Sequence, residues 1–488
     1  MADYLAFDFG AESGRAVAGS LAGRRLRIRE AHRFPNHLLT TEGRLHWDLD
    51  ALFGNLLEGL QRHTAESGAP RSIGVDTWGV DFGLLDAAGK LLESPTAYRD
   101  DRTRGAMEYF FHKLPRRRIY ERTGVQFLPF NTLFQLASLV RDGSPLLERA
   151  RDLLFMPDLF HYRLTGERFS EFTFATTSQL YNPRDYEWDE RLFQALAISR
   201  EWMQDVVMPG TVIGNVREEW AAQTGCGPVP VVAVATHDTG SAIAAVPAQG
   251  EDWAYISSGT WSLMGVEARE PVIGDAAYEA NLTNEGGVGG RFRVLKNITG
   301  LWLLQQCRRQ WDPTRSYADL AAAAQTAAPF VSLVDPDDAA FLNPDDMPTA
   351  IVDFCVRTGQ PAPVGEAAMT RCIFESLALK YRFVLEQLRA VTGHEVNRIH
   401  VIGGGCQNEL LCQFTADATG LPVTAGPVEA TAIGNLLVQA MAMGEVESLT
   451  ELRRVVRESF EMREYAPREP AAWDEVWPRF RALAAGGE

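Results

Sequence analysis

Several features that mark other protein classes are scarce in this chain of 488 residues. It has six cysteines, at positions 226, 307, 355, 372, 406 and 412, and no CxxC pair among them. This scatter disfavours both a cysteine metal site and a disulfide scaffold. Whether Cys355 and Cys372 pair depends on their separation in the fold.

Positive charge is also in short supply. Lys plus Arg total 47 against 64 for Asp plus Glu, so the formal net charge is −17. This balance argues against nucleic acid or an anionic membrane as the partner. It leaves nucleotides open as ligands, because local backbone amides and metal ions bind them rather than net charge.

Long apolar runs are missing as well. The longest uncharged stretches, 123–140 and 220–236, contain Gly, Pro, Gln and Thr, which disfavours a membrane span. The opening residues, MADYLAFD, show neither the basic region nor the apolar core of a signal peptide. We therefore expect a cytoplasmic protein without a membrane partner. No interface stripe stands out, so monomer and small homo-oligomer both stay open.

The order of elements predicts two α/β halves, since a chain of this length exceeds one hydrophobic core. Three short strands occupy the first 35 residues or so, and a strand, tight turn and strand recur at 253–266. Helices at about 50–66 and 366–391 follow the two hairpins, and buried-type strands at 72–76 and 398–402 come after them. We predict a duplicated α/β fold with domains 1–246 and 247–488 and a cleft between them, a common ligand site.

The first motif is DFGAESGR, in which an apolar strand ends on Asp8 and a turn with Gly10 and Gly14 follows. It lacks the Gly-Lys-Ser/Thr of a Walker A loop. A hairpin can nevertheless point backbone amides at phosphate oxygens, and an aspartate at the strand end suits a hydrated Mg²⁺. An ordinary hairpin with a surface aspartate is the alternative.

The second motif is THDTGSA, where a buried-type strand leads into His237, Asp238 and Thr239. An aspartate at such a strand end is a suitable general base for a hydroxyl group. Phosphoryl transfer depends mainly on positioning and charge neutralisation, so a base of ordinary strength suffices. A helix-capping aspartate beside a core histidine explains the same residues equally well.

Three further segments have polar or glycine-rich turns. SSGTWSLMG places an amide and the Thr260 hydroxyl where a phosphate could bind, and the glycines of VIGGGCQNELL allow a flat adenine or ribose to approach. A plain hairpin and a tight strand-to-helix turn are the alternatives. The polar cluster at 76–102 has the donors, acceptors and aromatic face that a sugar needs, and it also fits a solvated loop with salt bridges.

Taken together and in this order, these motifs resemble the FGGY family of carbohydrate kinases, from Tyr4 to about Met443. The resemblance rests on DFGAESGR, the Asp76 strand, YRDDR, HDT, SGT, GGG and EATAIG. It implies two actin-like, ribonuclease-H-like domains around a central cleft that holds ATP and a sugar. It also implies Mg²⁺ as the metal that accompanies ATP.

The resemblance further implies roles for individual residues. Asp238 is the expected catalytic base, and Asp8 is expected to hold Mg²⁺ through water. The residues expected at ATP are Ala11, Glu12, Ser13, Gly14, Arg15, Thr260, Gln305 and Gly404. The residues expected at the sugar are Gly79, His237, Asp238, Thr239 and Asn297.

Within the family, the closest matches are to the subgroup that phosphorylates L-rhamnulose at O1. Relatives acting on glycerol carry an Arg-Glu pair where this chain has Gly79 and Val80. The loss of that charged pair leaves room for a bulkier deoxy sugar and disfavours glycerol. A kinase for L-fuculose or L-xylulose is the alternative, and a non-catalytic actin-like module that binds ATP or a sugar is a third possibility.

The first hairpin departs from the family pattern, because Gly10-Ala11 replaces a common Gly-Thr. Backbone amides, Ser13 and Arg15 must then provide the phosphate contacts. We expect the Glu12 side chain to turn away from the phosphates while its amide faces them.

This interpretation predicts different effects for the two acidic residues of the hairpin. Asp8→Ala should raise the Mg²⁺ concentration needed for half-maximal activity, because a carboxylate near the metal's water shell is lost. Glu12→Ser should leave that concentration nearly unchanged. Titration of activity with Mg²⁺ measures both, and the reverse pattern would contradict the interpretation.

Overall fold

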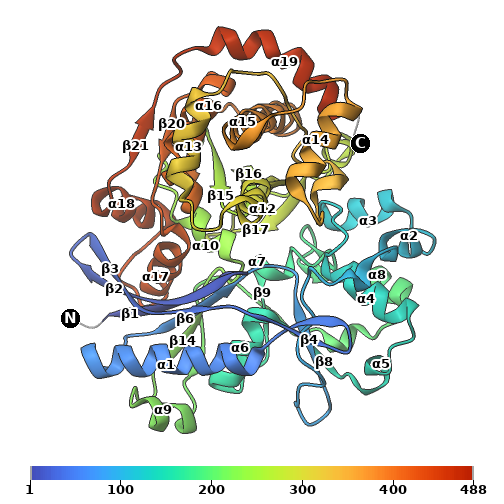
Figure 1. Cartoon of the computed structure of the whole chain (residues 1–488). Helices are drawn as coiled ribbons and strands as arrows, with labels where there is room; N and C mark the ends of the chain where they lie inside the picture. Colours follow the sequence, from blue (N-terminus) through green and yellow to red (C-terminus); the bar gives the residue numbers. More distant parts are fainter. Residues whose placement is uncertain (1–2, 486–488) are drawn as a thin grey trace. The chain divides into compact units, whose positions relative to one another are not determined.

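The computed structural model describes residues 3–485, which form two compact units (Figure 1). The first unit contains the chain up to Pro247, together with Glu267–Val294 and Ala430–Ser459. The second contains Ala248–Val266, Leu295–Glu429 and the chain from Phe460 onward. Two later segments thus return to the first unit. A single boundary along the chain does not describe this arrangement. The predicted division at 246 and 247 stays a prediction.

A six-stranded sheet forms the centre of the first unit, in the order β13-β14-β6-β1-β2-β3. β6 is parallel to both β1 and β14, whereas β2, β3 and β13 are antiparallel to their neighbours. The strands are β1 (Tyr4–Phe9), β2 (Ser13–Ala22), β3 (Arg25–Pro35), β6 (Ile73–Thr77), β13 (Thr211–Asn215) and β14 (Pro230–Ala233). The three strands predicted in the first 35 residues are present.

A seven-stranded sheet, in which β17 is an additional strand that belongs to the first unit, repeats this arrangement. Its order is β17-β18-β16-β15-β19-β20-β21, and β15 forms a hairpin with β16 while running parallel to β19. β19 and β20 are parallel, and β21 is antiparallel at the edge. The strands are β15 (Trp253–Ser258), β16 (Trp261–Ala268), β17 (Thr283–Gly286), β18 (Phe292–Thr299), β19 (Arg398–Ile402), β20 (Val423–Ala425) and β21 (Arg463–Tyr465). The predicted duplication is therefore confirmed strand by strand.

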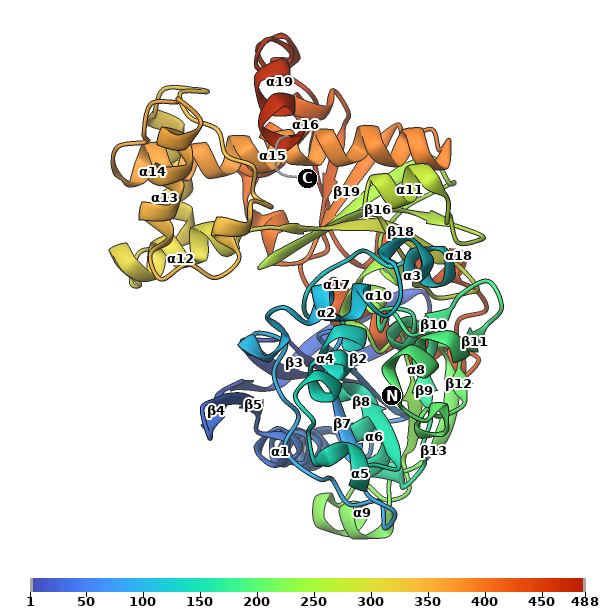
Figure 2. The same cartoon turned by 90° about the vertical axis from the view of Figure 1, so that its right-hand side faces the viewer.

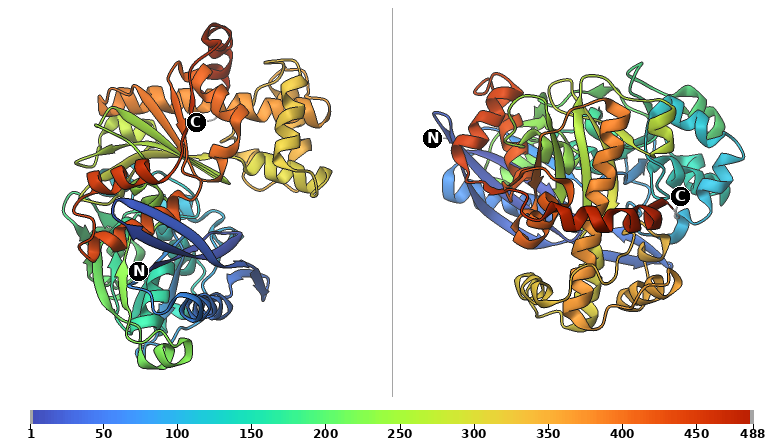
Figure 3. Two further views of the ribbon diagram at one scale, coloured as in Figure 1. Left: turned by 90° about the vertical axis from the view of Figure 1, so that its left-hand side faces the viewer. Right: turned by 90° about the horizontal axis from the view of Figure 1, so that it is seen from above.

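Helices cover both faces of the first sheet. α1 (Leu49–Ser67) begins after Asp48, whose Oδ1 accepts a hydrogen bond from the Ala51 amide at 2.9 Å. Its apolar residues recur every three to four positions and pack on the face of β1 that carries Phe7, where Gly59 leaves room for that ring. α17 (Ala430–Ala442) lies on the opposite face, as Figure 1 and the left panel of Figure 3 show.

The longest helix, α15 (Gly365–Thr392), organises the second unit. α12 (Trp302–Trp311) and α13 (Tyr317–Thr326) contact it, and with α14 (Met347–Arg357) they gather at one end of it in Figure 2. α16 (Glu409–Thr419) and α19 (Pro470–Ala485) also contact α15, and Figure 3 shows α19 crossing it.

Short elements complete the fold. Within the described residues, the first unit also contains four two-stranded sheets. They pair β4 (Leu38–Thr41) with β5 (Arg44–Trp47), β7 (Phe82–Leu85) with β8 (Asp152–Phe155), β9 (Ser170–Glu171) with β12 (Val206–Val207), and β10 (Tyr181–Asn182) with β11 (Glu187–Trp188). Its other helices are α2 (Ala106–Phe111), α3 (Arg116–Thr123), α4 (Thr132–Arg141), α5 (Leu146–Arg149), α6 (Met156–Thr165), α7 (Phe172–Ala175), α8 (Glu190–Leu196), α9 (Glu218–Thr224), α10 (Asp238–Ala244), α11 (Asp275–Glu279) and α18 (Leu449–Ser459).

The described residues, 3–485, bear on two questions: whether a helix could span a membrane and whether Cys355 and Cys372 pair. No helix in that range has the length and apolar character needed to cross a membrane. All six cysteines are buried free thiols, so Cys355 and Cys372 form no disulfide here.

The contact between α10 and α17 predicts a strict need for glycine at position 434. A Cβ there would lie 1.8 Å from the Ser241 carbonyl oxygen, so Gly434→Ala should lower the free energy of unfolding by about 1–3 kcal/mol. Gly54→Ala is the matched control, because nothing lies within 4 Å of that exposed helical position. It should be neutral or stabilising by up to about 1 kcal/mol. Denaturant unfolding of both variants measures the difference, and equal stability would contradict the tight contact.

Candidate active site

Three carboxylates belong to the same edge of the first sheet. β1, β6 and β14 are parallel, so their carboxyl ends meet at one edge. Asp8 and Asp76 are direct partners in the β1–β6 register. Asp238 comes from the segment that follows β14, and a bridge between Thr77 and His237 extends the parallel pairing to that segment. This edge is acidic and mostly buried.

Asp8 is paired with Arg15 across the first hairpin. The Asp8 Oδ2 accepts hydrogen bonds from Arg15 Nε at 3.0 Å and Nη2 at 2.7 Å. The two side chains are 9% and 21% exposed. The aspartate expected near Mg²⁺ and the arginine expected at a phosphate thus neutralise each other, and an incoming anion would compete with Asp8 for Arg15.

Backbone hydrogen bonds hold the turn of this hairpin. The Gly10 amide donates to the Ser13 carbonyl at 3.0 Å, and Asn36 donates from its side chain to the Gly10 carbonyl and from its amide to the Glu12 carbonyl. Gly14 is required for packing, since a Cβ there would lie 2.3 Å from the Phe34 ring. Ala11 is half-buried and Glu12 exposed. The expected ATP contacts of this loop stay a prediction.

Asp238 is the first residue of α10, with its side chain 31% exposed. Its Oδ1 accepts hydrogen bonds from the Thr239 amide and hydroxyl. Burial raises the pKa of this carboxyl, the Thr239 hydrogen bonds lower it, and the charge of Asp8 raises it further, so the net shift is upward. A half-buried carboxylate with a raised pKa is a suitable proton acceptor.

Asp76 is fully buried beside these two carboxylates. Its Oδ2 accepts a hydrogen bond from Asn435 Nδ2 of α17 at 2.6 Å. Burial raises its pKa well above the ordinary range, and the charges of Asp8 and Asp238 add to that rise. Asp76 therefore favours the protonated form, which limits the charge that accumulates at this edge.

The loop expected to contact a sugar is held in an unusual conformation. Val80 has φ 69°, a left-handed backbone that is costly for a β-branched residue. The Thr132 hydroxyl donates to the Val80 carbonyl at 2.7 Å and helps to fix it. Gly79 faces His237, because a Cβ at position 79 would lie 3.2 Å from His237 Nε2.

Asp81 anchors the same loop from inside the protein. Its Oδ2 accepts hydrogen bonds from the indoles of Trp47 and Trp78, and its Oδ1 accepts one from Gln135. Burial raises its pKa to about 6 although these bonds lower it. Asp81 is thus buried rather than solvated, and its contacts support the loop instead of pointing to a ligand.

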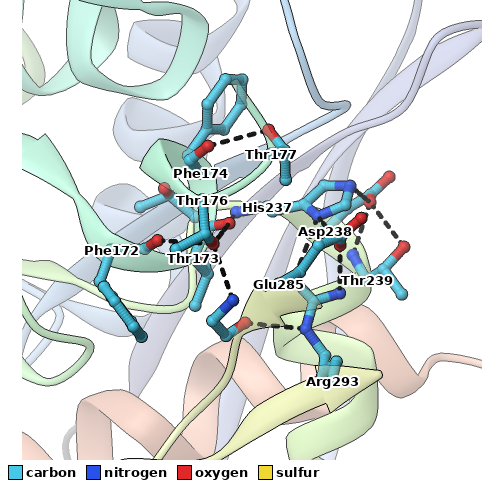
Figure 4. Close-up of polar contacts among 12 residues, drawn as sticks. Phe172, Thr173, Phe174, Thr176, Thr177, His237, Asp238, Thr239, Glu285 and Arg293 are labelled. Atoms are coloured by element: carbon cyan, nitrogen blue, oxygen red, sulfur yellow. Dashed lines mark hydrogen bonds and ion pairs between the residues drawn. The ribbon is translucent and has the colours of Figure 1, made fainter. Parts of the chain in front are cut away.

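Sequence reasoning did not single out Glu171, Glu285 or Arg293, which contact the His237 segment, and Figure 4 shows Glu285 and Arg293 beside the imidazole. Glu171 Oε2 accepts hydrogen bonds from the Thr236 amide at 3.0 Å and hydroxyl at 2.8 Å. Glu285 and Arg293 form a buried ion pair next to the imidazole. Glu285 lies in NLTNEGG, a motif that resembles the family, but no spacing rule connects it to position 237.

A separate pocket of about 620 Å³ lies within the second unit. Gln305, Gly404 and Gly259 line it, together with small residues of α13 and the start of α16. The Gln305 Oε1 is buried and accepts no hydrogen bond, so it can accept one from a ligand. This volume and lining suit a purine nucleoside, so the residues of the pocket fit the nucleoside part of ATP.

The glycines of this pocket permit close backbone packing. A Cβ at Gly405 would lie 2.0 Å from the Ser258 hydroxyl, and Gly403 has φ 79°. Asn408 caps α16 by accepting a hydrogen bond from the Leu411 amide. Thr260 lies in the β15–β16 turn next to Gly259, and Asn297 lies in β18.

The predicted site residues therefore form two sets. Gly79, His237, Asp238 and Thr239 lie together in the first unit, where the hairpin with Asp8 and Arg15 also belongs. Gln305 and Gly404 line one pocket in the second unit. No group of three or more described His, Cys, Asp or Glu side chains is arranged to hold a metal ion. The expected contact of Asp8 with Mg²⁺ stays a prediction.

Comparison with known proteins identifies relatives along nearly the whole chain. Residues 3–245 match the N-terminal domain of the FGGY family of carbohydrate kinases, and residues 254–443 match its C-terminal domain. A protein named rhamnulokinase from Bacteroides thetaiotaomicron is 49% identical over 98% of this chain and 99% of its own length. Another with that name, from Pectobacterium atrosepticum, is 45% identical over 98% and 96%. The family resemblance is confirmed.

Solved structures agree on the fold. A ligand-bound xylulose kinase from Lactobacillus acidophilus has a TM-score of 0.84 at 17% identity, covering 100% of this chain and 99% of that one. Plasmodium falciparum glycerol kinase with ADP has a TM-score of 0.80 at 14% identity, covering 100% and 98%. The two-domain α/β class expected from the sequence is confirmed.

The raised pKa of Asp238 predicts where activity is lost on acidification. A base must be deprotonated, so kcat/KM should fall as the pH drops through this pKa, above the ordinary aspartate value of about 3.9. Asp8→Asn removes a charge that raises this pKa. The acid limb of the profile, which is the fall of kcat/KM on acidification, should therefore move to lower pH. Asp101→Asn, at a largely exposed position, should leave it in place. Complete pH–rate profiles measure all three, and an unmoved limb in Asp8→Asn would contradict the electrostatic coupling.

Proposed function

Because the chain belongs to the FGGY family of carbohydrate kinases, we propose that it transfers the γ-phosphoryl group of ATP to the O1 hydroxyl of L-rhamnulose. The products are L-rhamnulose 1-phosphate and ADP. The observation that carries the proposal is Asp238, a half-buried carboxylate with a raised pKa at the sheet edge that also holds His237 and Gly79.

The identity of the sugar is supported by two observations. Curated relatives named rhamnulokinase are 42–49% identical over 94% or more of this chain. Gly79 and the strained Val80 form a compact loop without the Arg-Glu pair of glycerol-specific relatives. A 6-deoxy ketose needs that space and has a methyl group that favours apolar contact.

In this mechanism Asp238 accepts the proton of the attacking hydroxyl. Thr239 fixes the carboxylate through two hydrogen bonds, and His237 and Gly79 contact the sugar. Arg15 exchanges Asp8 for a phosphate oxygen, which turns an internal ion pair into a charge-assisted contact with the nucleotide. Asp8 would hold Mg²⁺ through water, and the ion would neutralise charge on the phosphates.

Gln305, Gly404 and the pocket they line are proposed to hold the nucleoside. Ala11 to Arg15 and Thr260 are proposed to contact the phosphates, and Asn297 the sugar. The enzyme is proposed to act in the cytoplasm, where ATP is available, as a monomer or small homo-oligomer.

A panel of acceptors with MgATP tests both the activity and the specificity. L-Rhamnulose, L-fuculose, L-xylulose and glycerol are compared by coupled detection of ADP. We expect the highest kcat/KM with L-rhamnulose and almost none with glycerol. A higher value with another ketose would favour the alternative substrate, and no sugar-dependent ADP release would favour a non-catalytic module.

Replacement of the proposed base separates catalysis from binding. Asp238→Asn should lower kcat by about 100-fold or more, because the amide cannot accept the proton. The KM for ATP should change little, since the nucleoside pocket belongs to other residues. Asp101→Asn serves as the matched control at an exposed site and should retain activity. Turnover near the unmodified level in Asp238→Asn would exclude Asp238 as the base.

A further inference from the structure

Arg293 is a fully buried arginine beside His237 (Figure 4). Its Nε donates to the Gly286 carbonyl at 2.8 Å. Its Nη1 lies 3.1 Å from Glu285 Oε2, and its Nη2 lies 3.3 Å from His237 Nδ1. Neither the sequence motifs nor the proposed mechanism gives Arg293 or Glu285 a task.

The contact with Nδ1 decides which ring nitrogen of His237 carries the proton. A guanidinium group stays charged and can only donate, so Nδ1 must accept. Glu285 Oε2 also lies 3.4 Å from Nδ1, but it accepts no hydrogen bond there, whereas the contact of Nδ1 with Arg293 Nη2 has hydrogen-bond geometry. A proton on Nδ1 would point at an N–H of Arg293. The neutral imidazole therefore carries its proton on Nε2.

The protonated Nε2 faces the reacting side of the site. It lies 3.5 Å from Asp238 Oδ1 and borders Gly79 in the sugar loop. An N–H group at this point can donate to a sugar oxygen beside the carboxylate. With the proton on Nδ1, this position would hold a lone pair that repels the Asp238 carboxylate and can only accept a hydrogen bond from a hydroxyl group.

α7 holds both partners of this contact in place. The Thr173 hydroxyl accepts a hydrogen bond from the His237 amide at 3.2 Å, and the Thr176 hydroxyl accepts one from the Gly286 amide at 2.7 Å. The Arg293 guanidinium is in turn bound to the Gly286 carbonyl. One short segment thus sets the distance between the imidazole and the ion pair.

Burial of this arginine requires the nearby carboxylate. A buried charge without a partner is costly, and Glu285 balances that of Arg293. Burial raises the pKa of Glu285, but the charge of Arg293 lowers it, and the net shift is downward, so Glu285 stays ionised. The pair as a whole adds little net charge beside Asp238.

We propose that Arg293, balanced by Glu285, is a positioning residue that fixes His237 as the neutral Nε2–H tautomer, so that Nε2 donates to a sugar oxygen next to the base. The contact of His237 with the sugar rests on the proposed function. The tautomer itself does not, because it follows from contacts within the first unit.

The first test is spectroscopic and uses the full chain. Nitrogen-15 spectra of histidine-labelled protein distinguish a protonated from an unprotonated Nδ1, and His237→Gln assigns the signal. We expect an unprotonated Nδ1 in the unmodified protein and a changed tautomer in Arg293→Met. A protonated Nδ1 in the unmodified protein would overturn the proposal without any variant.

The second test is kinetic. Arg293→Met should lower kcat/KM for the sugar by about tenfold or more while leaving the KM for ATP unchanged, because a misplaced donor affects only the sugar side. Arg293→Lys keeps a charged donor and should recover part of the loss. Arg371→Met, which breaks a comparable pair with Glu375 in the second unit, is the control for loss of a buried ion pair.

The two tests separate the possible failures. If Arg293→Met does not fold, the double variant Arg293→Met/Glu285→Gln removes both charges and is measured instead. A folded variant with unchanged kcat/KM and an unchanged tautomer would overturn the positioning role. If the unmodified protein phosphorylates no L-rhamnulose, the proposed function fails, while the spectra still decide the tautomer.

Discussion

The repulsion among three carboxylates at one sheet edge is the constraint on which the first unit's site depends. Asp8, Asp76 and Asp238 come together because β1, β6 and β14 are parallel and end at the same edge. Each is stabilised differently: Asp8 by Arg15, Asp76 by a hydrogen bond from Asn435 and a raised pKa, and Asp238 by partial exposure and Thr239. Asp238 has the most exposed side chain of the three.

Around this acidic edge, buried groups hold the functional segments in conformations that local sequence would not choose. Val80 keeps a left-handed backbone because Thr132 and the contacts of Asp81 fix its loop. His237 is held by α7 through its amide and by Arg293 through its ring. Such over-determined geometry is expected where a site must be formed before the ligand binds.

The duplication places different residues at the matching strand ends of the two sheets. β1 carries Asp8 next to its last residue and β6 ends in Asp76-Thr77, whereas the matching strands β15 and β19 are followed by Gly259 and Gly403. Carboxylates at the first edge suit proton transfer and cation contacts. Glycines at the second let the backbone line a nucleoside-sized pocket with Gln305.

The sequence by itself determined the elements, the duplication and the principal motifs, because apolar periodicity and glycine-rich turns are local signals. Asp8, Asp238 and Gly404 were recognisable at strand ends for that reason. Only the tertiary structure decided that Asp8 pairs with Arg15, that Asp81 is an internal anchor, and that Glu285 and Arg293 flank His237. The chain also returns twice to the first unit, bringing Arg293 and Asn435 to residues 56 and 359 positions away. Burial and pairing over such separations depend on how strands and helices pack, and no local pattern encodes them.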